Sequence, residues 1–173
     1  MTFLEQLQHY FQGERIAALA FMVPVGVFLF VLAGAAMKSE GGVFGVGIAV
    51  PLVVFGLFSG GVGLGIGLRT SAQVAALEAE LATSPRTMLG KELPRMRKVN
   101  GNWPILVAVW AVFVVVGMGL RFGVKADWAQ GVGPALVLAG ALGLLIDGFA
   151  ERRARPYTAA LEAQARQHGV AVD

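Results

Sequence analysis

Few residues of this chain have the types and spacing that catalysis needs. Cysteine is absent, and the two histidines, His9 and His168, lie near opposite ends of the sequence. Disulfides and thiolate catalysis are thereby ruled out, and we do not expect a multi-histidine metal centre. The chain has no His-Glu-x-x-His motif, no paired aspartates within an apolar segment, and no serine and histidine that topology could bring together. We expect no catalytic residues, no cofactor and no metal, and therefore no enzyme.

Two polar side chains lie within or next to long apolar segments. Ser59 is the one hydroxyl deep inside such a segment, and we expect it to bond to a carbonyl of its own helix. Asp147 is the single acid close to the interior of one; a boundary ion pair is the ordinary explanation and proton coupling the alternative. The glycine run at 60–67 lacks the spacing of both nucleotide-binding loops, so we expect no nucleotide site.

The composition is that of a membrane protein. Of 173 residues, 56 % are hydrophobic and only 14 % are charged, whereas soluble domains have about 45–50 % and about 25 %. Four segments without Asp, Glu, Lys or Arg are each long enough to cross a bilayer, which takes roughly 20 residues. The predicted fold class is an all-α membrane protein with a four-transmembrane-helix bundle, in a single membrane domain at 1–173. The predicted spans are 16–37, 43–68, 103–120 and 129–149.

The first fifteen residues have the pattern of an interfacial helix. Apolar residues recur at one helical face over 3–11, and Thr2 and Glu5 have the spacing of a capping box. We expect this helix, 1–15, to lie flat on the membrane with its aromatic side chains at headgroup depth.

Short cytoplasmic helices are predicted in the two other polar segments, a loop at 69–102 and a tail at 150–173. In the loop, Thr70 and Gln73 have capping-box spacing, and Ser84-Pro85 should end the helix that they begin. Gly90 and Pro94 should break the remainder of the loop. In the tail, a helix should open at Pro156. These pieces either pack into a small cytoplasmic cap or lie separately on the bilayer.

Basic residues predict the orientation. Eleven Lys and Arg residues lie in 1–15, 69–98 and 147–173, and three lie in the loops on the other side. By the positive-inside rule, both termini and the central loop are cytoplasmic. The net charge of +3 reflects this sidedness and contact with lipid headgroups, and we expect no nucleic-acid partner. The basic residues that should contact lipid or a protein partner are Arg95, Arg97, Lys98, Arg152 and Arg153.

Small residues predict how the helices associate. Gly56, Gly60, Gly63 and Gly67 lie on one face of the second span, where close van der Waals contact can hold helices together. Ala135, Ala139 and Gly143 form a similar row in the fourth span, and we expect the two faces to meet. The second row continues to Asp147, so we predict a charge pair between Asp147 and Arg69, or failing that Arg152 or Arg153. The glycine-rich helix could also let several subunits converge in an oligomer.

Three cytoplasmic stretches carry a resemblance. They are Arg69-Thr70 with Gln73 and Leu77; Glu92 with Arg95, Met96 and Val99; and Asp147, residues 150–154, Tyr157 and Leu161. With the four spans, they resemble a group of small bacterial inner-membrane proteins, some of which look like immunity proteins against membrane-acting toxins of neighbouring bacteria. The resemblance implies a non-enzymatic binding protein and transfers no catalytic residues.

The topology limits where a toxin could bind. The outward loops at 38–42 and 121–127 are too short for an interface of about 800 Å² per partner, so a toxin would be engaged within the bilayer or from the cytoplasm. The alternatives are an oligomeric channel or accessory subunit of a transport complex, which needs no charged lining, and an assembly factor for an envelope complex.

Overall fold

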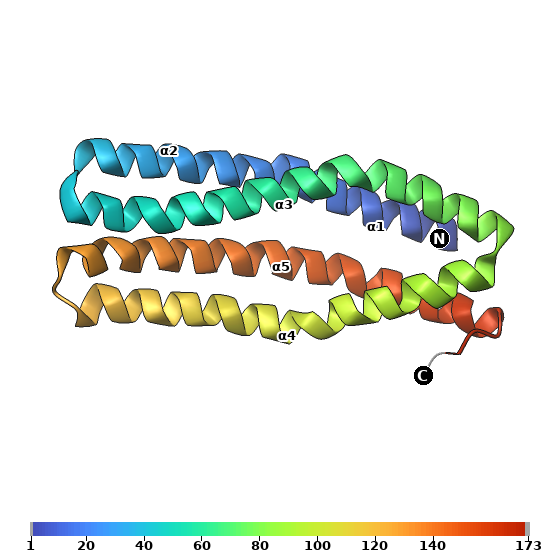
Figure 1. The fold of residues 1–173 in the computed structure, drawn as a ribbon. Helices are drawn as coiled ribbons and strands as arrows, with labels where there is room; N and C mark the ends of the chain where they lie inside the picture. Colours follow the sequence, from blue (N-terminus) through green and yellow to red (C-terminus); the bar gives the residue numbers. More distant parts are fainter. Residues whose placement is uncertain (1, 172–173) are drawn as a thin grey trace.

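The computed structural model describes residues 2–171 as a bundle of long helices (Figure 1). In chain order these are α1 (Phe3–Ala17), the π-helix η1 (Ala18–Met22), α2 (Val23–Ser39), α3 (Gly42–Thr83), α4 (Pro85–Gly123) and α5 (Asp127–Gln167). Residues 2–171 contain no strand, and the prediction of an all-α fold is confirmed. Residue 1 of the predicted N-terminal helix and residues 172–173 of the predicted tail lie outside the described residues.

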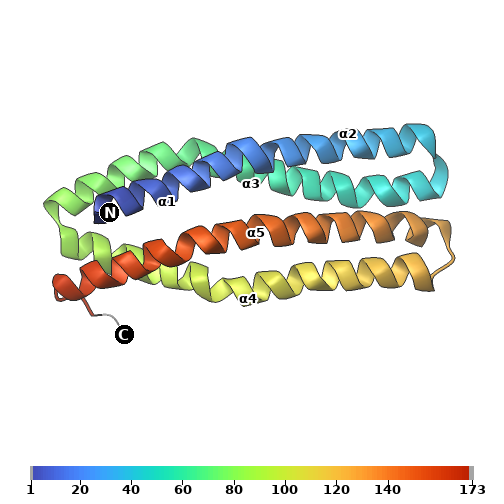
Figure 2. The same ribbon diagram turned by 180° about the vertical axis from the view of Figure 1, so that it is seen from behind.

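The helices run side by side as four arms. α1, η1 and α2 follow one another without a break and form the first arm. α3 and α5 lie in the middle of the bundle, where they contact each other; α2 packs on α3 and α4 packs on α5. Figures 1 and 2 show the α2–α3 and α4–α5 turns at one end, and the α3–α4 turn together with both chain termini at the other.

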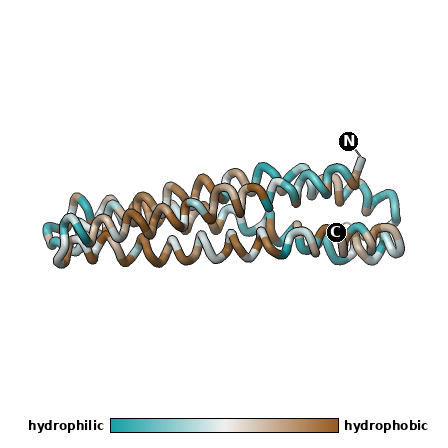
Figure 3. The backbone as a smooth tube through the Cα atoms, turned by 90° about the horizontal axis from the view of Figure 1, so that it is seen from above, coloured by the Kyte–Doolittle hydropathy of each residue, from teal (hydrophilic) through white to brown (hydrophobic). Residues whose placement is uncertain are grey.

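Each arm is long and apolar enough to cross a membrane, and the four predicted spans all lie within these helices. Figure 3 shows the hydrophobic residues gathered in the part of the bundle away from the N- and C-terminal end. This part contains the α2–α3 and α4–α5 turns (Figure 1). Large apolar side chains point outward there, with Val27 57 %, Val54 61 % and Leu68 76 % exposed. Because water-soluble monomers rarely expose apolar patches larger than a few hundred Å², this surface has the character of one that faces lipid. We call residues 18–68 and 103–149 the apolar half.

The helix ends follow local sequence signals at two places. Thr2 Oγ1 accepts from the Glu5 N–H at 3.3 Å, and Glu5 Oε2 accepts from the Thr2 N–H at 2.7 Å, so the predicted capping box is confirmed. α3 ends at Thr83 and α4 begins at Pro85, as Ser84-Pro85 predicts, because proline is favoured in a first helical turn and disfavours a helical residue before it.

Predicted helix boundaries at four positions are absent. Thr70 lies in the middle of α3, where its hydroxyl donates to the Ile66 carbonyl at 2.6 Å instead of capping a new helix. α4 continues through Gly90 and Pro94, and α5 continues through Pro156. The predictions of a helix start at Thr70, of breaks at Gly90 and Pro94, and of a tail helix opening at Pro156 are therefore wrong. Packing of these segments on one another outweighs the local cost of proline and glycine.

The polar ends of the helices pack into one core. Leu7, Tyr10 and Phe11 of α1 are buried together with Leu89 of α4 and Tyr157 of α5. The rings of Tyr10 and Tyr157 stack with their centroids 4.7 Å apart. Protein covers Tyr10 and Phe11, so these two rings do not contact lipid, and the depth of 1–15 in a membrane stays a prediction. Of the two predicted alternatives, the structure shows the cap, formed by 3–17, 70–102 and 150–167.

The glycine row of α3 packs on the first arm. A Cβ atom at Gly63 would lie 2.9 Å from the Ala18 carbonyl oxygen, and one at Gly56 would lie 3.1 Å from the Gly26 carbonyl oxygen. A Cβ atom at Gly26 would in turn lie 2.9 Å from the Gly60 nitrogen. Gly67 faces Leu19 of η1. The prediction that this face of α3 meets the small-residue row of α5 is therefore wrong.

The small residues of α5 have other neighbours. Gly143 faces the indole ring of Trp110 in α4. Ala135 and Ala139 are buried in the core of the apolar half. α3 and α5 approach each other closely near the α2–α3 and α4–α5 turns, where a Cβ atom at Gly47 would lie 2.6 Å from the Trp128 carbonyl oxygen. Helical periodicity predicts which residues share a face, but it does not say which neighbouring helix that face meets.

Candidate functional site

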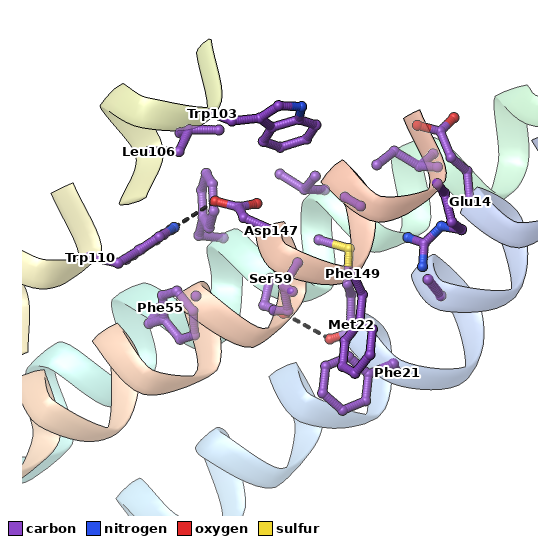
Figure 4. A pocket seen from close by; sticks show the side chains of 18 residues that line it. Glu14, Phe21, Met22, Phe55, Ser59, Trp103, Leu106, Trp110, Asp147 and Phe149 are labelled. Carbon is purple, nitrogen blue, oxygen red and sulfur yellow. Dashed lines mark hydrogen bonds between the residues drawn. The ribbon is translucent and has the colours of Figure 1, made fainter. Parts of the chain in front are cut away.

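A cavity of about 430 Å³ lies where the apolar half joins the cap (Figure 4). It is bounded by α1 and η1 on one side, by α4 on another, and by α3 and α5 between them. Its walls are mainly apolar and carry three ionisable side chains, Glu14, Asp147 and Arg153. The aromatic wall residues are Phe21, Phe55, Phe58, Trp103, Trp110 and Phe149.

The π-helix shapes the wall nearest to α3. The Val23 N–H donates to the Ala18 carbonyl, the five-residue spacing that widens a helical turn. Ser59 of α3 donates its hydroxyl hydrogen to the Met22 carbonyl oxygen at 2.9 Å. The expectation that Ser59 bonds to its own helix is therefore wrong. This bond joins α3 to η1 across the cavity wall, because the close approach at Gly63 brings the two backbones together.

Asp147 is held by an indole and not by an arginine. Its Oδ2 accepts a hydrogen bond of 2.6 Å from Trp110 Nε1. Because Gly143 has no side chain, the Trp110 ring lies against α5 one turn before Asp147. Figure 4 shows the carboxylate of Asp147 directed toward α4.

The predicted ion pair of Asp147 is absent. Arg69 is exposed on α3, and Arg152 is exposed on α5. Among the described residues, neither these two nor Arg153 forms an ion pair with Asp147. The prediction of an Arg69–Asp147 pair is therefore wrong. The bundle turns Asp147 toward α4, whereas Arg69 points away from the protein.

Glu14 and Arg153 line the cavity at its cap end. Glu14 Oε1 accepts from the Tyr10 hydroxyl at 2.7 Å. The stem of Arg153 crosses α1 at Gly13, where a Cβ atom would lie 2.8 Å from its Cδ. The Nε of Arg153 is buried and has no hydrogen-bond partner among the described residues. Glu14 and Arg153 thus face the same cavity from two helices and form no ion pair with each other.

A polar network inside the cap was not predicted from the sequence. Glu92 is only 4 % exposed, and its two carboxylate oxygens accept bonds of 2.7 and 2.6 Å from Arg95. Glu92 Oε1 also accepts from the Tyr157 hydroxyl at 3.2 Å. The hydrogen bond to Glu92 raises the pKa of Arg95, and burial raises the pKa of Tyr10 and of Tyr157. The available signal was that Glu92 and Arg95, three residues apart, lie next to the apolar positions Leu89, Leu93 and Met96.

The basic residues predicted to contact lipid or a partner have different surroundings. Arg95 binds Glu92, and its guanidinium carbon lies 6.0 Å from the centroid of the Phe11 ring. Arg97 forms an ion pair of 3.2 Å with Glu162. Lys98 and Arg152 are exposed, and Arg153 lines the cavity. The predicted contacts of these residues with lipid or protein stay predictions.

The arrangement has the chemistry of a binding site. Within 2–171, no group of three or more His, Asp or Glu residues could hold a metal ion. A cavity of this volume, with apolar walls and a few charged side chains, is typical of sites for small, partly apolar ligands. Comparisons with protein-family models, with curated proteins and with solved structures give no match.

Proposed function

We propose that this chain is a non-enzymatic integral membrane protein that binds an amphiphilic molecule in the cavity between its apolar half and its cap. The observation that carries the proposal is the composition of this cavity. Its aromatic and aliphatic walls suit an apolar tail, while Glu14, Asp147 and Arg153 offer contacts to a polar head. Its volume of about 430 Å³ lies within the range of about 300–1,000 Å³ that is usual for ligand sites.

The proposed environment is the inner membrane of a bacterium, with both termini and the cap in the cytoplasm. The exposed apolar side chains of the apolar half support insertion. The excess of Lys and Arg in and near the cap supports the sidedness. A reporter enzyme that is active only in the cytoplasm should be active when fused after residue 85, and one that is active only outside should not. The reverse pattern would contradict the orientation.

The level of the cavity supports a ligand that comes from the bilayer. The cavity lies at the border of the apolar half, and the tryptophans Trp103 and Trp110 line it. In the proposed membrane orientation, this border is the level at which phospholipid headgroups meet the hydrocarbon region. Tryptophan is enriched at this depth because its ring is apolar and its N–H is polar. An amphiphile could enter sideways from the inner leaflet without leaving the membrane.

Filling the cavity tests the proposal. Val62 lines it and is 37 % exposed, so Val62→Trp should occupy part of its volume. Val54, on the same helix, is 61 % exposed and lies outside the cavity, which makes Val54→Trp the matched control. Native mass spectrometry of protein purified in detergent should show one retained lipid fewer for Val62→Trp than for the wild type and for Val54→Trp. Equal retention by all three proteins would contradict the proposal.

Protection against a membrane-acting toxin, which the resemblance implies, is a role that such a binding protein could serve. An amphipathic toxin segment has the same combination of apolar and polar groups as the proposed ligand. Cells that express this chain should survive a toxin encoded beside its gene, and Val62→Trp should weaken that protection. Ion flux through liposomes containing the protein would instead support the alternative of an oligomeric channel.

A further inference from the structure

Two opposite charges face each other across the cap end of the cavity without forming an ion pair. Glu14 comes from α1 and Arg153 from α5, and both line the cavity. The Arg153 stem lies against Gly13, the neighbour of Glu14, so the two side chains begin close together. No ion pair within 4.0 Å joins them. The space between them therefore suits a headgroup that itself carries both charges.

Arg153 needs a hydrogen-bond acceptor. Its Nε is buried beside Gly13 of α1 and is closed to the cavity, whereas the two terminal nitrogens of its guanidinium are not buried and have no hydrogen-bond partner among the described residues. Guanidinium groups match the oxygen geometry of phosphates and carboxylates better than any other side chain does. Both carboxylates of the cavity have donors elsewhere, Glu14 from Tyr10 and Asp147 from Trp110. A phosphate oxygen from the ligand would bind these terminal nitrogens of Arg153.

The charge balance of the cavity limits the kind of phosphate. Two carboxylates and one guanidinium line it, so a headgroup with net negative charge would be repelled by Glu14 and Asp147. A headgroup that pairs its phosphate with an ammonium avoids this repulsion, because the ammonium can face Glu14. Glu14 Oε1 is used by Tyr10, which leaves Oε2 as an acceptor.

We propose that the cavity selects a zwitterionic phospholipid, with its phosphate on Arg153 and its ammonium on Glu14. The acyl chains then extend along Phe58 and Phe149 into the apolar half. This inference rests on the proposed function, because it names the headgroup of the ligand that the cavity binds. It opposes the general behaviour of membrane proteins with basic cytoplasmic surfaces, which attract anionic lipids.

Lipid competition in native mass spectrometry tests the selection. The full-length protein in detergent is mixed with equal amounts of phosphatidylethanolamine and phosphatidylglycerol, and the mass of the lipid lost in Val62→Trp identifies the cavity lipid. We expect phosphatidylethanolamine to exceed phosphatidylglycerol by about tenfold, the factor that one charge-assisted hydrogen bond supplies. If Val62→Trp loses no lipid, the proposed function fails. If it loses a lipid that is mainly phosphatidylglycerol, only the selection of a zwitterionic headgroup is overturned.

Charge variants assign the two contacts. Glu14→Gln keeps an acceptor for Tyr10 and should bring the ratio of the two lipids close to one. Arg153→Gln should lower cavity occupancy by both lipids, and Arg153→Lys should restore part of it, because lysine keeps the charge but not the planar fork. Arg166→Gln removes an exposed charge of the same helix that lies outside the cavity and should behave as the wild type does. A ratio unchanged in Glu14→Gln, or an occupancy unchanged in Arg153→Gln at an unchanged melting temperature, would overturn the assignment.

Discussion

Replacing Gly63 by alanine should loosen the contact between α3 and η1, whereas the same change at Gly65 should not. Both glycines lie in α3, two residues apart. A Cβ atom at Gly63 would lie 2.9 Å from the Ala18 carbonyl oxygen, 2.9 Å from Met22 Cβ and 3.1 Å from Val23 Cγ2. A Cβ atom at Gly65 would have no atom of another element within 4 Å.

The expected difference follows from these distances. Two of the three atoms near Gly63 are fixed to the backbone of η1, so the helices must move apart by several tenths of an ångström. Overpacking of this kind costs about 1–3 kcal/mol. Alanine is also the better helix former by about 1 kcal/mol, and this gain is common to both substitutions. Gly63→Ala should therefore be less stable than Gly65→Ala by about 1–3 kcal/mol, and Gly65→Ala should equal or exceed the wild type.

Equilibrium unfolding in mixed detergent micelles, followed by circular dichroism, measures this difference directly. Gly60→Ala provides a second check, because a Cβ atom at Gly60 also has no neighbour within 4 Å although Gly60 belongs to the predicted row. If the free energy of unfolding fell by the same amount in all three variants, the packing of α3 on η1 at Gly63 would be wrong. If Gly60→Ala were as damaging as Gly63→Ala, periodicity would predict the packing better than the structure does.

Three further predictions concern polar groups. Ser59→Ala removes the hydrogen bond from α3 to the η1 carbonyl and should cost about 0.6 kcal/mol and no more than about 1.7 kcal/mol, the mean and the maximum measured between membrane helices; an unchanged unfolding free energy would mean that this bond contributes nothing. Glu92→Gln should cost about 1.5–3 kcal/mol, because Arg95 loses a buried charged acceptor, while Glu80→Gln breaks only an exposed ion pair and should cost less than about 1 kcal/mol; equal losses would refute the role of the buried network. Burial raises the pKa of Tyr157 above its ordinary value of about 10. As the pH rises, the unfolded chain therefore releases this proton at a lower pH than the folded chain does. The free energy of unfolding should therefore stay constant below about pH 10 and fall above it. In Tyr157→Phe, the free energy of unfolding should fall less steeply with pH than in the wild type. Identical slopes in the two proteins would contradict the burial of Tyr157.

Part of the fold could be predicted because it depends on composition and local chemistry. Four long apolar segments require four long helices, and the capping box at Thr2 and the Ser84-Pro85 boundary are local signals that the structure confirms. The predicted breaks at Pro94 and Pro156 are wrong because they weigh only the local cost of proline. In the cap, burial of Leu89, Tyr157 and their neighbours keeps both helices continuous.

The candidate site could be predicted only in part. The sequence indicates Asp147, because an acidic residue beside a long apolar segment is easily recognised. Its partner was not found, because Trp110 comes from another helix and reaches Asp147 only over Gly143. The cavity itself was not predicted, and Glu14 and Arg153 meet there from segments far apart in the chain.

The sequence by itself determined that this chain forms long apolar helices with polar ends, because hydropathy and helix length are properties of each segment alone. It also determined which small residues share one helix face, because that follows from the helical repeat. Only the tertiary structure decided which faces meet, so that the α3 glycines contact η1 and the Trp110 ring covers Gly143. These choices depend on the summed packing of all arms, and no single helix carries that information. The cavity and its unpaired charges exist because of them.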